Sequence, residues 1–319
     1  MKINKHAGPF RRKIVKLITS IFFCFSKRTR KTMRDALCYV SLWHILKVLW
    51  HYKTSGNKTF KYNVSICACC KDEGEYFLEW IEYYLLLGVD HFYLYNNNGT
   101  DNTKELLHRY IDQNIVTWIE WPGITQQLDI YNDAIEKYKD ETRWMAIVDL
   151  DEFIVPTKYR QLPSILSHFN GINQILIPWI MYGSSGHNKW EKGLVIERFT
   201  KHASKPSHFT KAILNPRATI FAHVHRSVVF GRTTDEHKHD IIHSTPIKTI
   251  DILQINHYVV KSYEEYISKK QKRGDAYFSK SVFDDTFFKV HDVNDVDSPK
   301  LMPPYIQKIK SRIRTQLKK

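Results

Sequence analysis

The sequence predicts an α/β fold, in which a mixed, mostly parallel sheet is covered by helices on both faces. Between residues 62 and 148, four short apolar segments alternate with three longer amphipathic ones. Such alternation requires right-handed crossovers, which set parallel strands side by side and leave the connecting helices on the two faces. The composition agrees with a folded body, because 43% of the 319 residues are hydrophobic and only 25% are charged.

The elements of this first half follow from local patterns. Short apolar runs followed by turn residues predict buried strands, and amphipathic runs predict helices. Asp72 and Glu75 have capping-box spacing at the start of the first helix, and Gly88 is a suitable residue to end it. The predicted strands are 62–70, 91–95, 115–121 and 144–148, and the predicted helices are 75–87, 103–111 and 126–138.

The second half of the chain is less regular. Residues 157–255 hold apolar runs at 174–180 and 193–199, which we expect to be strands, among loops rich in Gly, Ser and His. No linker interrupts residues 61–298, so we expect a single body with a regular half, 61–155, and an irregular half, 156–298.

The net charge of +15 resides at the two ends of the chain. Residues 1–61 hold 15 Lys and Arg with one acid, residues 300–319 hold seven with no acid, and the segment between is mildly acidic. A nucleic-acid enzyme more usually carries positive charge along a groove of its folded body. We therefore expect no nucleic-acid partner and an anionic surface instead, of which membrane phospholipid is the commonest.

Both ends predict amphipathic helices at a membrane surface. Segments 13–27 and 36–50 are apolar with narrow polar stripes, and Tyr39, Trp43 and Trp50 suit the level of lipid headgroups. We expect residues 1–60 and 299–319 to associate with a membrane without a spanning helix or a signal peptide. The alternative for each stripe is a helix packed on the protein's own core. The C-terminal stripe consists of Ile306, Ile309, Ile313 and Leu317.

The sharpest chemical feature is the acidic run Asp149, Asp151 and Glu152, directly after an apolar strand. Ligands of parallel α/β sheets bind beyond the carboxyl ends of the strands, so this run lies where a ligand is expected. Crowded and desolvated carboxylates are costly unless a cation compensates them, and hard oxygen ligands suit Mg²⁺ or Mn²⁺. The alternative is a helix cap with a salt bridge to Lys or Arg. A second Asp-x-Asp, at 295–297, lies in a polar stretch typical of a solvated loop.

Three further positions are candidates for binding. His257 follows an apolar run and is a candidate metal ligand, although a core histidine is the commoner role of such a residue. Positive charges suited to a diphosphate follow it at Lys261, Lys269 and Arg273. The loop 181–190 offers hydrogen bonds to a polyhydroxylated acceptor from Ser184, Ser185 and His187, or is an ordinary loop. P-loop and G-x-G-x-x-G motifs are absent from the sequence, and its single C-x-x-C does not suggest zinc.

These segments resemble glycosyltransferase family 92 and the related family-2-like glycosyltransferases once described as a domain of unknown function. The matching stretches are 71–102, 121–153, 182–187, 193–199 and 255–274, in the family's order. One departure is Asp72, where such proteins often have Asn after the Lys. The resemblance implies a GT-A-like fold, a nucleotide-sugar donor with UDP as the default base, and transfer with inversion.

The resemblance also implies roles for individual residues. Asp149 and Asp151 become the metal-binding pair, with Asp151 the main catalytic carboxylate and His257 the third ligand. Residues 61–155 become the nucleotide-binding half and 156–298 the acceptor half. The general base stays open among Glu197, Asp235 and Glu236, for each of which a surface salt bridge is the simpler role. The residues expected to line the nucleotide are Lys71, Glu73, Asn97, Asp101 and Gln127.

We thus expect a metal-dependent inverting glycosyltransferase that acts on a glycan or glycolipid acceptor. Its basic, apolar ends favour a peripheral position at the cytoplasmic face of a bacterial inner membrane. Abundant Lys, Asn and Ile are typical of AT-rich bacterial genomes and point to lipopolysaccharide or lipooligosaccharide assembly. Two alternatives remain. A sugar-nucleotide nucleotidyltransferase needs an NTP and releases pyrophosphate, and a non-enzymatic membrane adaptor tolerates loss of both aspartates.

Overall fold

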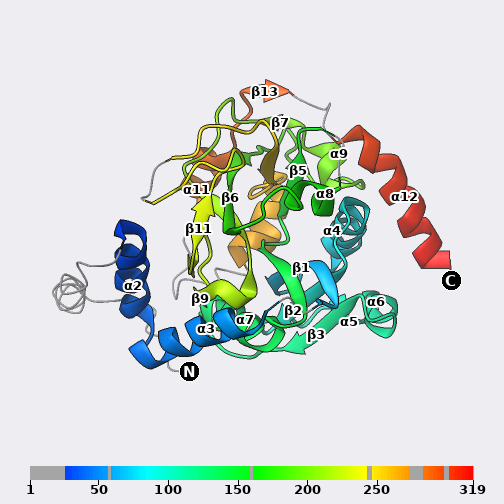
Figure 1. Ribbon diagram of the computed structural model, residues 1–319. Helices are drawn as coiled ribbons and strands as arrows, with labels where there is room; N and C mark the ends of the chain where they lie inside the picture. The colour runs from blue at the N-terminus through cyan, green and yellow to red at the C-terminus, as the bar shows by residue number, and fades with distance from the viewer. Residues whose placement is uncertain are drawn as a thin grey trace.

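The main sheet is the predicted α/β architecture. A computed structural model describes residues 26–56, 59–158, 161–242, 246–272, 283–297 and 302–318 (Figure 1). The strands of the main sheet lie in the order β3-β2-β1-β4-β8-β6-β12-β5, and β11 pairs with β6. Their bounds are β1 Tyr62–Cys70, β2 His91–Asn96, β3 Val116–Glu120, β4 Thr142–Ile147, β5 Glu152–Pro156, β6 Ile172–Met181, β8 Thr210–Leu214, β11 Arg232–Thr234 and β12 Leu253–His257.

Strand direction divides the sheet into two parts. β1 to β4 pair in parallel, as predicted, whereas β8 runs antiparallel to β4 and β6, and β5 runs antiparallel to β12. The mixed, mostly parallel sheet expected of a GT-A-like fold is therefore confirmed. The short strands outside it are β7 Lys201–His202, β9 Thr219–Phe221, β10 Val228–Val229 and β13 Val296–Asp297.

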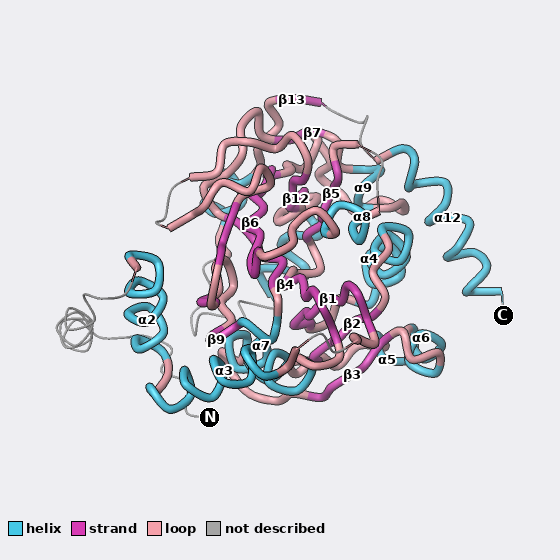
Figure 2. The backbone as a smooth tube through the Cα atoms, viewed as in Figure 1, coloured by secondary structure: helices cyan, strands magenta, loops and turns pink. Residues whose placement is uncertain are grey.

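Helices cover both faces of the parallel part (Figure 2). Val64 and Ile66 of β1 share one core with α4, and Cys67 shares the other core with α7, because neighbouring strand residues point to opposite faces. The helical elements are α2 Lys27–Tyr39, α3 Leu42–Thr54, α4 Gly74–Leu87, α5 Thr103–Leu106, α6 His108–Asp112, α7 Gln127–Tyr138, α8 Leu162–Leu166, α9 Val195–Arg198, a 3₁₀ turn Pro216–Ala218, α10 Tyr263–Glu265, a π-helical turn Tyr266–Gln271, α11 Asp285–His291 and α12 Pro303–Lys318.

The ends of α4 test two predictions of capping. Gly88 ends the helix in the left-handed conformation, with a φ of 93°, as predicted. The capping box is wrong, because Glu73 occupies the cap position without a side-chain hydrogen bond. The Asp72 carboxylate instead accepts the backbone N–H groups of Thr100 and Asp101, which ties the start of α4 to the loop after β2.

Two other predicted elements differ from the structure. The helix expected at 103–111 is split into α5 and α6. The strand expected at 193–199 is wrong, since these residues form the single turn α9. The buried Glu79 carboxylate accepts the N–H groups of Val195 and Ile196 at 2.7 and 3.0 Å, and this satisfies the start of a helical turn in place of a neighbouring strand.

The C-terminal stripe packs on the protein's own core. Ile309 is fully buried in α12, and Ile306 and Ile313 pack against the core cluster that contains α4. The expectation that this stripe faces a membrane is therefore wrong for these three side chains. The side chain of Leu317 lies outside the described residues.

Residues 26–56, the described part of the N-terminal region, form the two helices α2 and α3. Segment 13–25 lies outside the described residues, and the predicted apolar helix 36–50 is broken between α2 and α3. Ser41 caps α3 by accepting the N–H of His44 at 3.2 Å, which explains the break. Among the described residues, the structure contains no helix with the length and hydropathy to span a bilayer.

Candidate active site

The acidic run 149–152 crosses one edge of the sheet from β4 to β5. Ile147 pairs with Ala212 and Glu152 pairs with His257, so the amino ends of β8 and β5 meet the carboxyl ends of β4 and β12 at this edge. Lys211, the second residue of β8, therefore lies beside the aspartates, as His257 does. The loops that follow β1, β2 and β3 lie at this same edge, because these strands run parallel to β4.

Asp149 is held by three donors. Its carboxylate lies 2.6 Å from the Lys211 ammonium and accepts hydrogen bonds of 3.1 Å from the Gln127 amide and the Tyr131 hydroxyl. Burial would raise the pKa of Asp149, but the charge and hydrogen bond of Lys211 outweigh that effect and hold the pKa below its usual value. Asp149 is therefore ionised at neutral pH, with about one third of its side chain (32%) exposed.

Asp151 is more deeply buried, with 8% of its side chain exposed. One carboxylate oxygen lies 2.5 Å from the Lys270 ammonium and the other lies 3.5 Å from Nε2 of His257. Burial opposes ionisation, yet Lys270 and His257 together hold the pKa of Asp151 well below its usual range. The second carboxylate of the pair is thus also charged at neutral pH.

Glu152 completes the cluster from the interior. Its side chain is fully buried, 3.3 Å from Lys211, and accepts the backbone N–H of Asp149 at 2.8 Å. Burial raises the pKa of Glu152 to about 8, with Asp149 and Asp151 adding to the rise against the opposing charge of Lys211. Asp149 and Glu152 therefore share Lys211, and of the three acidic groups at this edge only Asp149 and Asp151 are ionised at neutral pH.

The donor set fits a divalent cation of the Mg²⁺ or Mn²⁺ kind. Asp149 and Asp151 offer carboxylate oxygens, and His257 turns Nε2 towards Asp151, while its buried Nδ1 has no hydrogen-bond partner in the part of the chain that the structure describes. A cation at Asp151 has to displace the Lys270 ammonium, which lies on the π-helical turn 266–271. Among the described residues, the group whose ligand atoms all lie within 4.8 Å of one another is instead Glu236, His237 and Asp251, and those of Asp149, Asp151 and His257 are not gathered this closely.

The loops after β1, β2 and β3 are joined next to this cluster. Asp101 accepts the N–H of Gly74 at 2.9 Å, and Asn97 donates to the carbonyl oxygens of Trp121 and Gly123 at 2.8 and 3.0 Å. Lys71 and the buried Glu73 lie in the first of these loops. The predicted nucleotide-lining residues Lys71, Glu73, Asn97 and Asp101 therefore lie in loops joined by hydrogen bonds, which form a strip of strand-end loops. Gln127 links this strip to Asp149.

Lys261 and Lys269 form a cationic wall near Asp151. Lys261 and Lys269 lie 4.4 and 4.7 Å from the centroid of the Tyr76 ring. Burial lowers the pKa of Lys261 to about 8. The Tyr76 hydroxyl donates to Glu265 at 2.9 Å, and Arg198 pairs with the same carboxylate through two 2.8 Å hydrogen bonds. Arg273, predicted to join this wall, lies outside the described residues.

The predicted acceptor loop is held by hydrogen bonds to two other segments of the chain. The N–H groups of Ser184 and Ser185 donate to Asp292 and Asn294, while the Ser185 hydroxyl accepts the N–H groups of Thr200 and Lys201. His187 lies 3.4 Å from the exposed Glu191. Both serines thus organise the loop, as the alternative interpretation of this segment expects.

The three candidate bases do not gather at the aspartates. Glu197 pairs with Lys310 of α12 at 2.5 Å, and Asp235 accepts two backbone N–H groups and the His239 ring within its own turn. Glu236 accepts the N–H groups that precede and begin β12, including that of Leu253. It therefore lies at the other end of β12 from His257, roughly 13 Å away along four residues of strand.

Sequence comparison decides the family. A family model described as glycosyltransferase family 92 matches residues 47–293, which is most of the chain and includes the whole carboxylate cluster. The chain belongs to glycosyltransferase family 92. The predicted resemblance is thereby confirmed.

Curated relatives of this family 92 chain come from plants. A glycosyltransferase family 92 protein of Arabidopsis thaliana is 23% identical over 232 residues, covering 68% of this chain and 38% of the relative. One from Oryza sativa subsp. japonica is 24% identical over 161 residues, covering 49% and 27%. The chain thus spans less than two fifths of the length of these relatives.

Solved structures resemble the family 92 chain only in part. TarS 1–349 of S. aureus in complex with UDP has 14% identity and a TM-score of 0.31, covering 40% of this chain and 38% of that one. UDP-glucose pyrophosphorylase complexed with UDP-glucose has 7% identity and a TM-score of 0.29, covering 48% and 76%.

Proposed function

We propose that this chain transfers a glycosyl group from a nucleotide-sugar, with a UDP-sugar as the first donor to test, to a glycan acceptor with inversion. The observation that carries the proposal is the pair Asp149 and Asp151 at the sheet edge, in a member of family 92, with the strip of strand-end loops linked to Asp149 through Gln127 and the cationic wall near Asp151. A ligand with a diphosphate bridges these two surfaces in the proposed complex.

The residues at this edge have separate roles in the proposed transfer. Asp151 with Asp149 and His257 would hold a divalent cation, which supplies Lewis-acid stabilisation of the departing diphosphate. Lys261, Lys269 and the displaced Lys270 add positive charge around the same oxygens. The Arg198–Glu265 pair fixes the Tyr76 ring under Lys261 and Lys269.

Inversion requires an acceptor hydroxyl to attack the anomeric carbon from the face opposite the leaving group, with its proton passing to a base. Glu197, Asp235 and Glu236 are engaged elsewhere, so the base has to come from another group at the edge or from the bound acceptor complex. A lipid-linked glycan of bacterial lipopolysaccharide or lipooligosaccharide type is the acceptor we propose, from the basic N-terminal region.

A thermal-shift panel of sugar nucleotides, with and without Mn²⁺, tests donor and metal together. We expect one donor to raise the melting temperature only when Mn²⁺ is present. Asp151→Asn should abolish this shift and the transfer activity, while Asp297→Asn, in the exposed second Asp-x-Asp, should leave both unchanged. Full activity of Asp151→Asn in EDTA refutes the metal role.

A second assay separates the nucleotidyltransferase alternative. That enzyme releases pyrophosphate from an NTP and a sugar phosphate, whereas a glycosyltransferase releases a nucleoside diphosphate from a nucleotide-sugar. We expect only the second product.

A further inference from the structure

The outward face of α3 is apolar. Leu42, Trp43, Leu46 and Trp50 have exposed fractions of 47, 78, 46 and 68%. Their spacing of three, four and seven to eight residues places them on one side of the helix. Two tryptophans and two leucines on one exposed helix face form a hydrophobic patch of the kind that marks a docking site.

The inward face of the same helix is fixed by polar contacts. His44 lies 3.1 Å from the carbonyl oxygen of Ile220, Lys47 pairs with Glu136 at 2.7 Å, and His51 lies 3.1 Å from Asp140. Ile45 and Val48 are buried between these contacts. The polar stripe of His44, Lys47 and His51 therefore faces the protein, and the tryptophans cannot turn inward without breaking three contacts.

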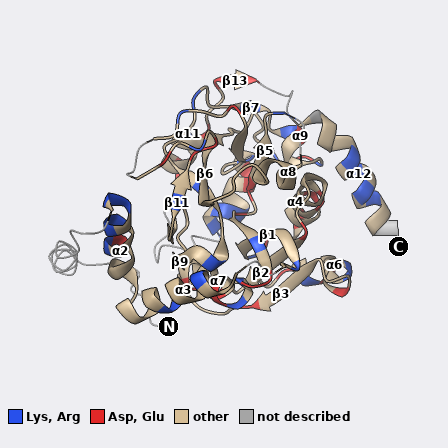
Figure 3. Ribbon diagram, viewed as in Figure 1, with Lys and Arg blue, Asp and Glu red and all other residues tan. Residues whose placement is uncertain are grey.

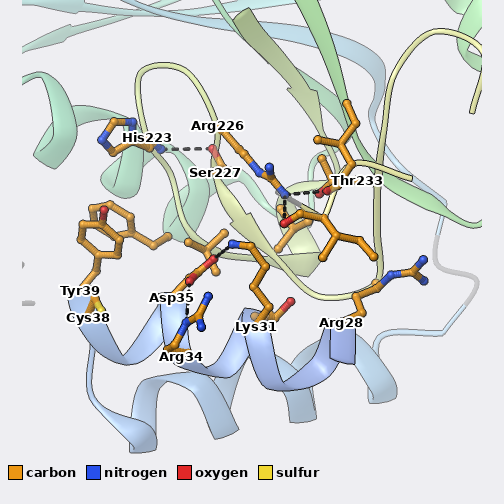
Figure 4. A pocket seen from close by; sticks show the side chains of 17 residues that line it. Arg28, Lys31, Arg34, Asp35, Cys38, Tyr39, His223, Arg226, Ser227 and Thr233 are labelled. Carbon is orange, nitrogen blue, oxygen red and sulfur yellow. Dashed lines mark hydrogen bonds and ion pairs between the residues drawn. The ribbon is translucent and has the colours of Figure 1, made fainter. Parts of the chain in front are cut away.

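The helix that precedes the patch in the chain is positively charged. The helix α2, which precedes α3, holds five Lys and Arg and one acid, and these basic residues stand out along it in Figure 3. Between α2 and the body lies a cavity of about 530 Å³ (Figure 4), lined by four cationic side chains, Arg28, Lys31, Arg34 and Arg226, and by the acid Asp35. Arg226 donates to the carbonyl oxygen of Ile241 at 2.7 Å.

We propose that α2 and α3 form the surface by which this protein docks on an anionic lipid bilayer, with Trp43 and Trp50 among the headgroups. Tryptophan prefers the membrane–water interface, and clustered cations attract anionic lipid. A second copy of the chain fits less well, because two such surfaces carry the same charge and repel each other. The inference does not depend on the transfer reaction, so its failure leaves the proposed glycosyl transfer untouched and removes only the support for a lipid-linked acceptor.

Cosedimentation of the full chain with vesicles tests the proposal. The vesicles contain equal parts of phosphatidylglycerol and phosphatidylcholine, or phosphatidylcholine alone. We expect binding to the anionic vesicles, weakened by salt, and a loss of about tenfold or more in partitioning for Trp43→Ala with Trp50→Ala. Trp190→Ala, which removes an exposed tryptophan from another surface (47% exposed), is the matched control and should bind as the wild type does.

Leu46→Gln provides a second variant in the same stripe and should weaken binding in the same direction. Circular dichroism confirms that each variant is folded. The proposal is overturned if the tryptophan variant partitions like the wild type. It is also overturned if light scattering shows a dimer that depends on Trp43 and the wild type ignores anionic vesicles.

Discussion

Replacing Lys211 with Met tests whether one buried lysine holds the carboxylate cluster together. The Lys211 side chain is 2% exposed, and its ammonium lies 2.6 Å from Asp149 and 3.3 Å from Glu152. Methionine fills a similar volume but has no charge. The variant therefore leaves two buried or half-buried carboxylates facing each other without their cation.

The expected loss follows from this geometry. Removing one partner of a buried ion pair costs about 3–5 kcal/mol, and the partial exposure of Asp149 places the expected value near the lower end, about 3 kcal/mol. Glu152 limits the loss of stability further, because it remains protonated and so adds no second unpaired charge. At roughly 2–4 °C per kcal/mol for a domain of this size, the melting temperature should fall by about 6–12 °C.

Urea unfolding of the full chain at pH 7, followed by circular dichroism, measures the change. Lys47→Met is the matched control, since Lys47 pairs with Glu136 at 2.7 Å while both side chains are about half exposed. Such an exposed pair contributes less than about 1 kcal/mol. A Lys211→Met variant no less stable than the control contradicts the assigned role. Added Mn²⁺ should stabilise Lys211→Met more than the wild type, because the ammonium no longer competes for Asp149.

Three further substitutions test the fold around the site. Gly88→Ala should cost about 1–2 kcal/mol in urea unfolding, because φ is 93° and the new Cβ meets Pro163 at 2.9 Å; an unchanged midpoint contradicts this. Burial opposes ionisation of Glu265, but Arg198 hydrogen bonds bring its pKa to about 2 from 4.5. Glu265→Gln should therefore cost about 2 kcal/mol above pH 4.5, and the difference from the wild type should shrink as the pH falls towards 2; a gap independent of pH refutes it. Ile309→Asp should lower stability by about 3 kcal/mol or more by burying an unpaired charge, and a neutral effect in thermal melts would return α12 to the membrane interpretation.

The sequence by itself determined the parallel half of the sheet and the place of the carboxylates. Strands β1 to β4 and helices α4 and α7 each carry their own period and end signals, such as Gly88, so local pattern suffices. The aspartates directly follow an apolar strand, and strand ends in a parallel sheet converge. Asp149, Asp151 and the strand-end loops could therefore be predicted to share one edge.

Only the tertiary structure decided which groups meet these carboxylates. Lys211 is a single lysine in an apolar strand, a signal that could have been noticed, whereas Lys270 stands in a run of lysines where nothing distinguishes it. Both arrive through pairings between segments more than 60 residues apart, which no local pattern encodes. The antiparallel insertion of β8 between β4 and β6 is the cause for Lys211.

The tertiary structure also decided which face of each amphipathic helix is buried. The sequence shows an apolar stripe in α3 and another in α12, and both suit either a core or a membrane. The turn α9 also depends on a distant partner, because the Glu79 carboxylate accepts the N–H groups of Val195 and Ile196 and so starts a helical turn where the apolar run predicts a strand. In α12 the stripe packs on α4, while in α3 contacts with Ile220, Glu136 and Asp140 turn the tryptophans outward. Amphipathicity fixes the existence of two faces, but the orientation depends on partners distant in the chain.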